Sequence, residues 1–397
     1  MIRSRTYFAI VVGLVLLLSG GCSSAAAPTA TVTPTRTPQP TATVMLIPPT
    51  VTPTATPLPT TAAPTAAPVN VVTPFPPDVN PLTGLKLADP TMLDHSPLAI
   101  KISNSAEVRP QSGLNSADLV FEHYAEGGIT RFTAVFYGTY PERVGSVRSG
   151  RLIDLEIPAM YHAPFAYSGS SAGVKEKYRN SDLFPARIMS PDFGVGEPAF
   201  YRVPREGLAF EHTLFANPMA LRELAIERGV DQRPAFPKLM AFSEGLPAVK
   251  DTHDATRVYV DYQVGKTQWD YDSASGHWLR TTVGVPHTDY LTGEQLHFAN
   301  VMILYANHLE TDILEDTWGG GHMSIEIQVW GQGPALLFRD GKMIQGFWQR
   351  AAREEMLTFI DGEGKALPLK PGNTWFQMVP LETQSSEATP GQYRFTP

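Results

Sequence analysis

The sequence predicts an α+β protein in which a long tether precedes a folded body of two parts. Residues 23–78 are dominated by Thr, Pro and Ala, which predicts a disordered linker. Residues 79–245 mix helix and strand patterns, which predicts a mixed α/β domain with a small sheet. Residues 255–380 contain almost only strand patterns broken by Gly, Asp and Asn, which predicts a mainly antiparallel β domain. We expect the boundary between these domains within residues 244–256, and a disordered tail over residues 381–397.

Residues 1–22 have the pattern of a secretory signal. A cationic start with Arg3 and Arg5 precedes an apolar run from Tyr7 to Leu18. The run is shorter than the roughly 20 apolar residues of a membrane span. Cys22 is the only cysteine of 397 residues and follows a glycine, as in a bacterial lipobox. We therefore expect export, lipidation of Cys22 and anchoring at the outer face of the cytoplasmic membrane. The alternative is an ordinary cleavage shortly after Cys22, which would discard the thiol.

The linker composition also predicts a mechanical role. Proline favours the polyproline II conformation, with a rise of about 3.1 Å per residue, so roughly fifty residues reach on the order of 150 Å. Such a spacer would hold the folded body away from a membrane.

The charge of the chain excludes some classes of partner. The formal net charge is −8, and only Arg3, Arg5, Arg36 and Asp78 of the charged residues precede position 79. The body is therefore more acidic than the whole chain, which argues against nucleic acid and requires any anion site to be local. The sequence has no Walker loop and no Gly-rich dinucleotide fingerprint after a strand, so we expect no cofactor.

The first domain is expected to contain four strands and three helices. Alternating patterns predict strands over residues 97–103, 118–125 and 129–138, with the last two forming a hairpin. Helical spacing covers residues 151–162, where Pro158 should end or kink the helix. A short apolar strand over 163–169 and a short helix over 171–180 follow. The clearest helix, residues 217–229, has Asn217 as its cap and Gly229 at its end.

The second domain is expected to contain a series of strands. The sequence Asp340-Gly341 between Arg339 and Lys342 is a strong signal for a tight hairpin turn. The predicted strands cover residues 257–263, 267–272, 277–283, 297–307, 323–331, 334–340 and 342–350.

Long motifs of the body resemble the YerB-like bacterial lipoproteins, a family with N- and C-terminal parts and no established activity. The N-terminal motifs are residues 80–85, 100–136 and 145–156, and the C-terminal motifs are residues 271–280, 291–304, 340–348 and 369–380. The resemblance supports lipidation of Cys22. It also marks polar positions of the family pattern, namely Asn104, Arg109, Gln111, Asp118, Glu122, Glu126, Thr130, Arg131, Arg148, Arg151 and Asp154. His212 falls in a Pro-His-Asn stretch of the family, although Glu211 and Thr213 flank it here.

Two arginines one helical turn apart are the strongest candidate for a binding site. Arg148 and Arg151 lie shortly before the small-residue loop of Ser168, Ser170 and Ser171. Guanidinium groups match carboxylates and phosphates, and free amides at a helix N-terminus also favour anions. The alternative is an internal ion-pair network with nearby carboxylates. The residues expected to contact a ligand are Asn104, Arg109, Glu122, Glu126, Arg131, Arg148, Arg151, Asp154, Ser168, Ser170, Ser171 and His212.

The same loop has a second interpretation. Gly169, Ser171 and Gly173 satisfy G-x-S-x-G between a predicted strand and a predicted helix, the context of a nucleophile elbow. Asp182 or Asp192 and then His212 would complete a catalytic triad. The few strands of the first domain argue against the large parallel sheet that such an elbow requires.

Histidines and aromatic residues of the second domain give weaker signals. His287, Asp289, His308, Asp312 and His322 show no metal-binding motif, so we expect no metal site. Aromatic residues on strands usually lie in the core, and the alternative is an exposed row that binds sugars or a partner. The residues concerned are Tyr259, Tyr262, Trp269, Tyr271, Trp278, Trp318, Trp330, Trp348 and Trp375.

These observations predict an envelope-anchored binding or scaffold protein rather than an enzyme. Its expected partners are the membrane, through the lipid, and an anionic wall polymer or a wall-synthesis protein. The alternative is a secreted serine-type hydrolase acting through Ser171 and His212 on envelope material.

Overall fold

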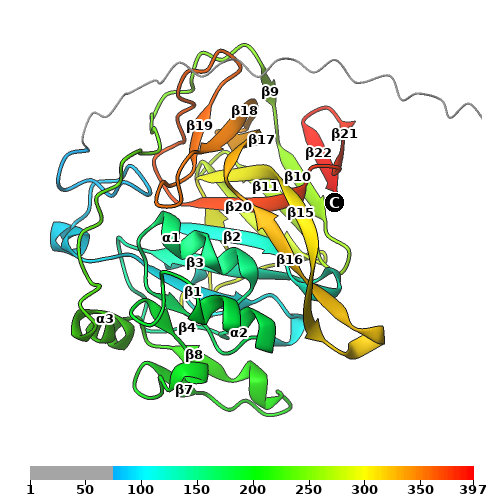
Figure 1. Cartoon of the computed structure of the whole chain (residues 1–397). Coiled ribbons are helices and arrows are strands. Elements are labelled where there is room, and N and C mark those ends of the chain that lie inside the picture. Colours follow the sequence, from blue (N-terminus) through cyan, green and yellow to red (C-terminus); the bar gives the residue numbers. More distant parts are fainter. Residues whose placement is uncertain (1–74) are drawn as a thin grey trace, which may run out of the picture. The chain divides into compact units, whose positions relative to one another are not determined.

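β20 (Thr374–Pro380), a strand near the end of the chain, lies in the middle of the larger β-sheet (Figure 1). The computed structural model of the protein describes residues 75–397, so the predicted signal, Cys22 and the tether up to residue 74 lie outside this part. The sheet has the order β19-β18-β17-β15-β20-β2-β3-β1-β5-β6, with β16 beside β15 and β9 beside β18. Its strands are β1 (Leu98–Ser103), β2 (Leu119–Tyr124), β3 (Thr130–Phe136), β5 (Phe165–Ala166), β6 (Ile188–Met189), β9 (Thr252–Asp254), β15 (Asn300–Asp316), β16 (His322–Gln328), β17 (Gly331–Arg339), β18 (Lys342–Arg350), β19 (Thr358–Ile360) and β20 (Thr374–Pro380).

The central strands are buried on both faces. Every residue of β1, β2 and β3 is buried, as is all of β20 except its last residue. β20 pairs in parallel with both β2 and β15. Because β20 is buried on both faces, water cannot satisfy the hydrogen bonds of its edges, and both edges need a neighbouring strand. The predicted hairpin of β2 and β3 is confirmed.

This sheet joins the two parts that the sequence analysis placed in separate domains. Strands from residues 98–189 and from residues 252–380 form one hydrogen-bonded sheet. The predicted boundary itself contributes β9, which pairs with β18. The sequence shows which residues form strands but not which strands pair. The small sheet expected for the first domain is in fact five strands of one twelve-stranded sheet.

The second sheet covers one face of the first. Its strand order is β13-β12-β11-β10-β22-β21, with β14 beside β12. Between the sheets lies an aromatic core that contains Phe132, Trp269, Trp278, Trp375 and Phe395. Its strands are β10 (Arg257–Asp261), β11 (Lys266–Asp272), β12 (His277–Thr282), β13 (Val285–Pro286), β14 (His297–Phe298), β21 (Gln384–Thr389) and β22 (Gln392–Thr396).

The tail is ordered, contrary to the disorder expected for residues 381–397. β21 and β22 form a hairpin, and β22 pairs in parallel with β10. Tyr393 and Phe395 alternate inward and are buried in the aromatic core, which stabilises this last strand. Most residues of the tail are polar, so the short alternation of Tyr393 and Phe395 with polar residues was not recognised as a strand.

Helices and turns cover the opposite face of the larger sheet, where Ile157, Met160, Tyr178 and Phe376 belong to a second core. The helix expected over residues 151–162 is divided in two, because Pro158 lies in the first turn of a separate short helix. The helices are α1 (Ile157–Met160), α2 (Ala172–Arg179) and α3 (Pro218–Glu227), and the 3-10 turns are η1 (Pro90–Asp94), η2 (Ala106–Val108), η3 (Leu114–Ser116), η4 (Glu126–Gly128), η5 (Leu152–Leu155), η6 (Pro191–Phe193), η7 (Phe210–His212) and η8 (Trp318–Gly320).

Two further features complete the architecture. A small sheet of β4 (Val144–Gly145), β7 (Phe200–Arg202) and β8 (Leu214–Ala216) lies below the main sheet in Figure 1. β15 extends beyond the main sheet, where it pairs with β16 as a projecting hairpin. Few helices and many strands in mixed and antiparallel sheets confirm the α+β class. Within residues 75–397, no helix combines the length and apolarity needed to cross a membrane.

Candidate functional site

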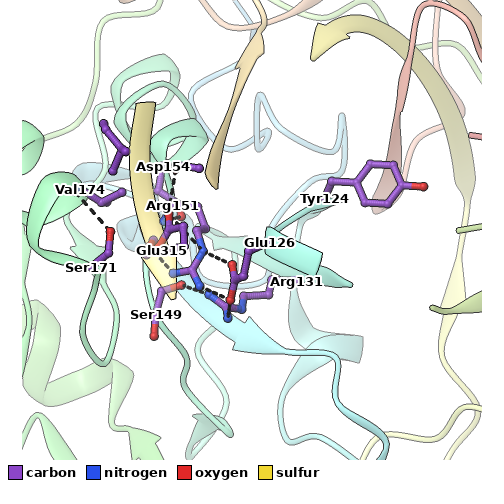
Figure 2. A network of polar contacts seen from close by, with 12 residues as sticks. Tyr124, Glu126, Arg131, Ser149, Arg151, Asp154, Ser171, Val174 and Glu315 are labelled. Carbon is purple, nitrogen blue, oxygen red and sulfur yellow. Dashed lines mark hydrogen bonds and ion pairs between the residues drawn. The ribbon is translucent and has the colours of Figure 1, made fainter. Parts of the chain in front are cut away.

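Arg151 is held by carboxylates of the protein itself. Its guanidinium donates from Nε to Glu126 Oε2 at 2.5 Å and from Nη2 to Glu126 Oε1. Arg131 donates to the same Glu126 Oε1 at 2.5 Å, so two guanidinium groups hold one carboxylate (Figure 2). Glu315, on the projecting hairpin, lies 3.6 Å from Arg151 Nε. For Arg151, this geometry matches the internal ion-pair alternative.

The charge state of Glu126 follows from this clamp. Burial alone would raise the pKa of its carboxyl, but the charge of Arg131 and the hydrogen bonds from Arg151 outweigh burial and lower the pKa to about 2. Glu126 is therefore ionised at neutral pH, and together with Glu315 it offsets the positive charges of Arg131 and Arg151.

A second buried cluster lies on the same face of the sheet. Lys101 Nζ lies 2.7 Å from Asp154 Oδ2 and 2.6 Å from His123 Nε2, and the Lys101 and Asp154 side chains are fully buried. His123 donates from Nδ1 to the Tyr124 carbonyl, so its Nε2 accepts from the lysine. Burial lowers the pKa of Lys101 to about 8 despite the neighbouring carboxylate. Asp154, a predicted ligand residue, therefore has an internal partner and no exposed surface.

Glu122 lies at the centre of a buried polar cluster on the other face of the sheet. Its side chain is 0% exposed and accepts five hydrogen bonds. Asn104 and Thr130 donate to Oε1, while Arg280 donates to Oε2 at 2.9 Å. Oε2 also accepts from Trp375 and Gln377. Glu122 thus links both parts of the sequence but cannot contact a ligand directly.

Arg280 was not identified from the sequence, although one signal was present. Along β12, buried positions alternate, and Arg280 takes an inward one between Trp278 and Thr282. Its side chain is fully buried, and its guanidinium lies 4.9 Å from the Trp375 ring centroid. Arg280 also hydrogen-bonds to His287 Nδ1, so it connects Glu122 to a longer polar chain.

His287 extends this series of hydrogen bonds to Ser103, the last residue of β1. Its Nε2 lies 2.6 Å from Gln111 Oε1, and Gln111 Nε2 donates to the Ser103 carbonyl at 2.8 Å. His287 is therefore a hydrogen-bonded core residue.

A cavity of about 300 Å³ opens where the two sheets meet at these strand ends. Asn104, Arg109, Thr130, Arg131 and Arg148 form its polar side. The cavity is further lined by Ser103, Ser105, Ala106, Glu107, Ile129, Val264, Gly265 and Val283. Four predicted ligand residues, Asn104, Arg109, Arg131 and Arg148, are thereby brought together.

Arg109 is positioned for this cavity by Asn104. Its Nη2 donates to the Asn104 carbonyl at 2.7 Å and to Asn104 Oδ1 at 3.0 Å. Since Asn104 also donates to Glu122, the buried network sets the orientation of Arg109. Arg109 Nε is buried without a hydrogen-bond partner in the described part of the chain.

Arg148 differs from Arg151 in having no partner for its charge. Its backbone N–H donates to the Lys101 carbonyl and its own carbonyl accepts from Ser168 N–H at 3.0 Å, which fixes the main chain. Within residues 75–397, its guanidinium makes no ion pair and no hydrogen bond. Burial lowers its pKa, and the nearby Glu211 carboxylate opposes that effect. Arg148 thus lines the cavity without an ion-pair partner among the described residues.

The serine loop does fold back onto Arg148, but the Ser171 hydroxyl caps a helix instead of facing a ligand. Ser171 Oγ accepts from Val174 N–H at 3.4 Å and caps α2 (Figure 2). A Cβ placed on Gly169 would lie 3.7 Å from the Asp192 carboxylate, which disfavours an anion at this loop. Ser170 Oγ is buried without a partner among the described residues.

The residues of the catalytic alternative do not form a hydrogen-bonded set. Ser171 Oγ bonds to the backbone of its own helix, and Asp182 pairs with Arg353 at 2.9 Å. His212 Nδ1 is buried and, in the part of the chain that the structure describes, has no hydrogen-bond partner. Burial and then the Arg148 charge lower the pKa of His212. Among residues 75–397, neither a histidine nor a carboxylate hydrogen-bonds to Ser171 Oγ.

The remaining candidates divide between core and surface. In the described region, no group of three or more His, Cys, Asp or Glu side chains is placed to hold a metal ion. Of the aromatic residues, Tyr262, Trp269, Trp278, Trp348 and Trp375 are buried. Trp318, at the tip of the projecting hairpin, is 81% exposed, and Trp330 is also exposed.

Comparison with known proteins gives a consistent result. The N-terminal and C-terminal domains described as "Protein of unknown function (DUF3048)" match residues 82–231 and 258–376. "Putative lipoprotein YerB" of Bacillus subtilis strain 168 is 30% identical over 305 residues, which cover 76% of this chain and 86% of that protein. The crystal structure of YerB protein from Bacillus subtilis aligns with a TM-score of 0.62 at 28% identity, covering 76% of this chain and 96% of that one. The resemblance predicted from the sequence motifs is confirmed.

Proposed function

The chain belongs to the YerB-like family of proteins of unknown function. We propose that it is a lipid-anchored, extracytoplasmic protein that binds an anionic component of the cell envelope. The cavity lined by Asn104, Arg109, Thr130 and Arg148 is the binding site. One observation carries this proposal. Arg148 has no partner for its charge within residues 75–397, and it lines the same cavity as Arg109.

The charge of the cavity supports an anionic ligand. Arg131 is compensated by Glu126, whereas Arg109 and Arg148 are not paired with a carboxylate in the described region. A half-buried guanidinium has lost part of its hydration, and an anion that replaces this water stabilises its charge. The paired N–H donors of the guanidinium match a carboxylate or a phosphate. The rest of the body is acidic, so an anion is attracted only over a short range.

The anchor rests on the sequence of residues 1–22 and on the printed name of the relative. Arg3 and Arg5, the apolar run and Cys22 form the pattern of a lipoprotein signal, and the YerB relative is described as a "Putative lipoprotein". Replacing Cys22 by Ala tests this part. We expect Cys22→Ala to move the protein from the membrane fraction to the soluble fraction, and unchanged membrane association would contradict lipid anchoring.

Binding is tested with the purified full-length chain in detergent micelles. Soluble cell-wall fragments, both muropeptides and anionic wall polymers, would be titrated by isothermal calorimetry. Loss of a charged hydrogen bond costs about 1.5–3 kcal/mol, so we expect Arg148→Gln and Arg109→Gln to weaken binding by about 10- to 100-fold.

Arg179→Gln is the matched control, because Arg179 is exposed and pairs only with Glu176 within its own helix in the described part. It should bind like the wild type. Equal affinities of the wild type, Arg109→Gln and Arg148→Gln for every fragment, with all proteins folded by circular dichroism, would contradict the proposed site.

A further inference from the structure

We propose that the anion is the terminal carboxylate of a short peptide with small apolar side chains, an inference that rests on the proposed function of the same cavity. A phosphate group on a sugar or glycerol polymer is the competing chemistry. The charge of the cavity, the apolar residues that line it and the backbone conformation of Val283 distinguish the peptide carboxylate from the phosphate.

The charge of the cavity matches a single negative charge. Among the described residues, Arg109 and Arg148 are its cations without an ion-pair partner, and Glu107 lines the same cavity. The Glu107 carboxylate lies close enough to both arginines to raise their pKa values, in opposition to burial. A phosphate with up to two negative charges, or a polymer carrying many, would meet this carboxylate and the surrounding acidic surface. A monoanionic carboxylate pairs with the guanidinium forks at a smaller repulsive cost.

Part of the cavity lining is apolar. Ile129, Val264 and Val283 form this part, and Val264 and Val283 are each 64% exposed. Both valines lie in tight turns of the second sheet, where polar residues normally face water. A ligand that places small apolar groups against them would remove this surface from water, which favours binding. A glycerol phosphate unit offers little apolar surface for such contact.

The backbone of Val283 supports a role for this apolar part of the lining. Thr282 pairs with Val285, so Val283 and Gly284 are the two turn residues between β12 and β13. Both have positive φ, 49° for Val283 and 79° for Gly284, as in a type I′ turn. That turn favours Asn or Asp at its first position, and a β-branched residue there is strained. Contact with a ligand would account for a strained apolar residue at the cavity rim.

The volume of the cavity also agrees with a chain end. About 300 Å³ lies at the lower limit of small-molecule pockets, which accommodates the last residues of a peptide rather than a length of polymer.

The test uses the full-length chain in micelles and calorimetric titration with defined probes. N-acetyl-Ala-Ala with a free carboxylate is compared with its C-terminal amide and with glycerol 1-phosphate. The all-L and all-D forms of the dipeptide separate the end of a protein chain from the end of a wall peptide. We expect the free carboxylate to bind at least tenfold more tightly than the amide and than glycerol phosphate.

Val283→Asn supplies a variant that must remain folded. Asn suits the turn, so we expect an equal or higher unfolding midpoint together with at least threefold weaker binding of the carboxylate peptide. Val285→Asn is the matched control, because Val285 is similarly exposed but does not line the cavity. Tighter binding of glycerol phosphate, equal binding of the amide, or undiminished peptide binding by Val283→Asn would overturn the peptide inference while leaving an anion site. Failure of every anion to bind would overturn the proposed function as well.

Discussion

Glu122→Gln tests whether the two parts of the chain depend on one buried charge. Glu122 and Arg280 are 0% exposed, and the carboxylate accepts five hydrogen bonds. A glutamine of the same shape replaces one oxygen by an NH₂ group, which must face either the two donors at Oε1 or the three at Oε2. In both orientations the charge of Arg280 loses its counter-ion in the core. Breaking a buried ion pair in this way costs about 3–5 kcal/mol.

The measurement is urea unfolding followed by both tryptophan fluorescence and circular dichroism. We expect the free energy of unfolding to fall by about 3–5 kcal/mol with an unchanged dependence on urea, because the exposed surface of the unfolded chain does not change. Glu176→Gln is the control, since Glu176 is exposed and pairs with Arg179 at 3.5 Å. Its effect should stay within about 0.5 kcal/mol.

A second variant separates the lost counter-ion from lost packing. The double variant Glu122→Gln/Arg280→Met removes the unpaired charge and should be more stable than Glu122→Gln alone. A loss below about 1 kcal/mol for Glu122→Gln, or a double variant less stable than the single one, would refute the importance given to this ion pair.

Three further changes address other parts of the structure. Burial lowers the pKa of His308 to about 4, and its Nε2 has no partner among the described residues. Because the unfolded chain binds this proton near pH 6.5, the free energy of unfolding should fall by up to about 2–3 kcal/mol as the pH is lowered from 7 to 4.5. In urea titrations, His308→Gln should lose less stability than the wild type over the same pH range. Ser171→Ala should cost about 0.5–1 kcal/mol as a lost helix cap and leave wall-fragment binding intact, whereas abolished binding would give the hydroxyl another role. Phe395→Ala should lower stability by about 3–5 kcal/mol, because its ring is buried between the sheets, while a near-zero change in thermal unfolding would contradict the ordered tail.

Local features of the fold were predictable because they depend on neighbouring residues. The Asn217 cap accepts from the backbone of Met219 and Ala220, as expected from its place before Pro218. The turn at Asp340-Gly341 has positive φ at both residues, as a two-residue hairpin requires. Each of these depends on a few consecutive residues, so the sequence contains all the information needed.

The pairing of distant strands could not be predicted in this way. β20 lies between β2 and β15 because both of its edges and both of its faces need partners, and many strands of the sequence satisfy that demand equally. The candidate site was predicted in part for the same reason. Arg148 and Arg151 look equivalent in the sequence, and only the approach of Glu126 and Glu315 distinguishes the paired arginine from the free one.

The central position of β20 also determines when the protein can become folded. The main sheet lacks its middle strand until residues 374–380 are available, and the second sheet lacks β22 until residue 396 is. Folding is therefore governed by contacts between residues far apart in sequence, which makes it slow. A chain exported from its N-terminus, as we propose, emerges without a closed sheet until translocation is almost complete. For the same reason, neither of the two matched family segments should fold when produced without the other.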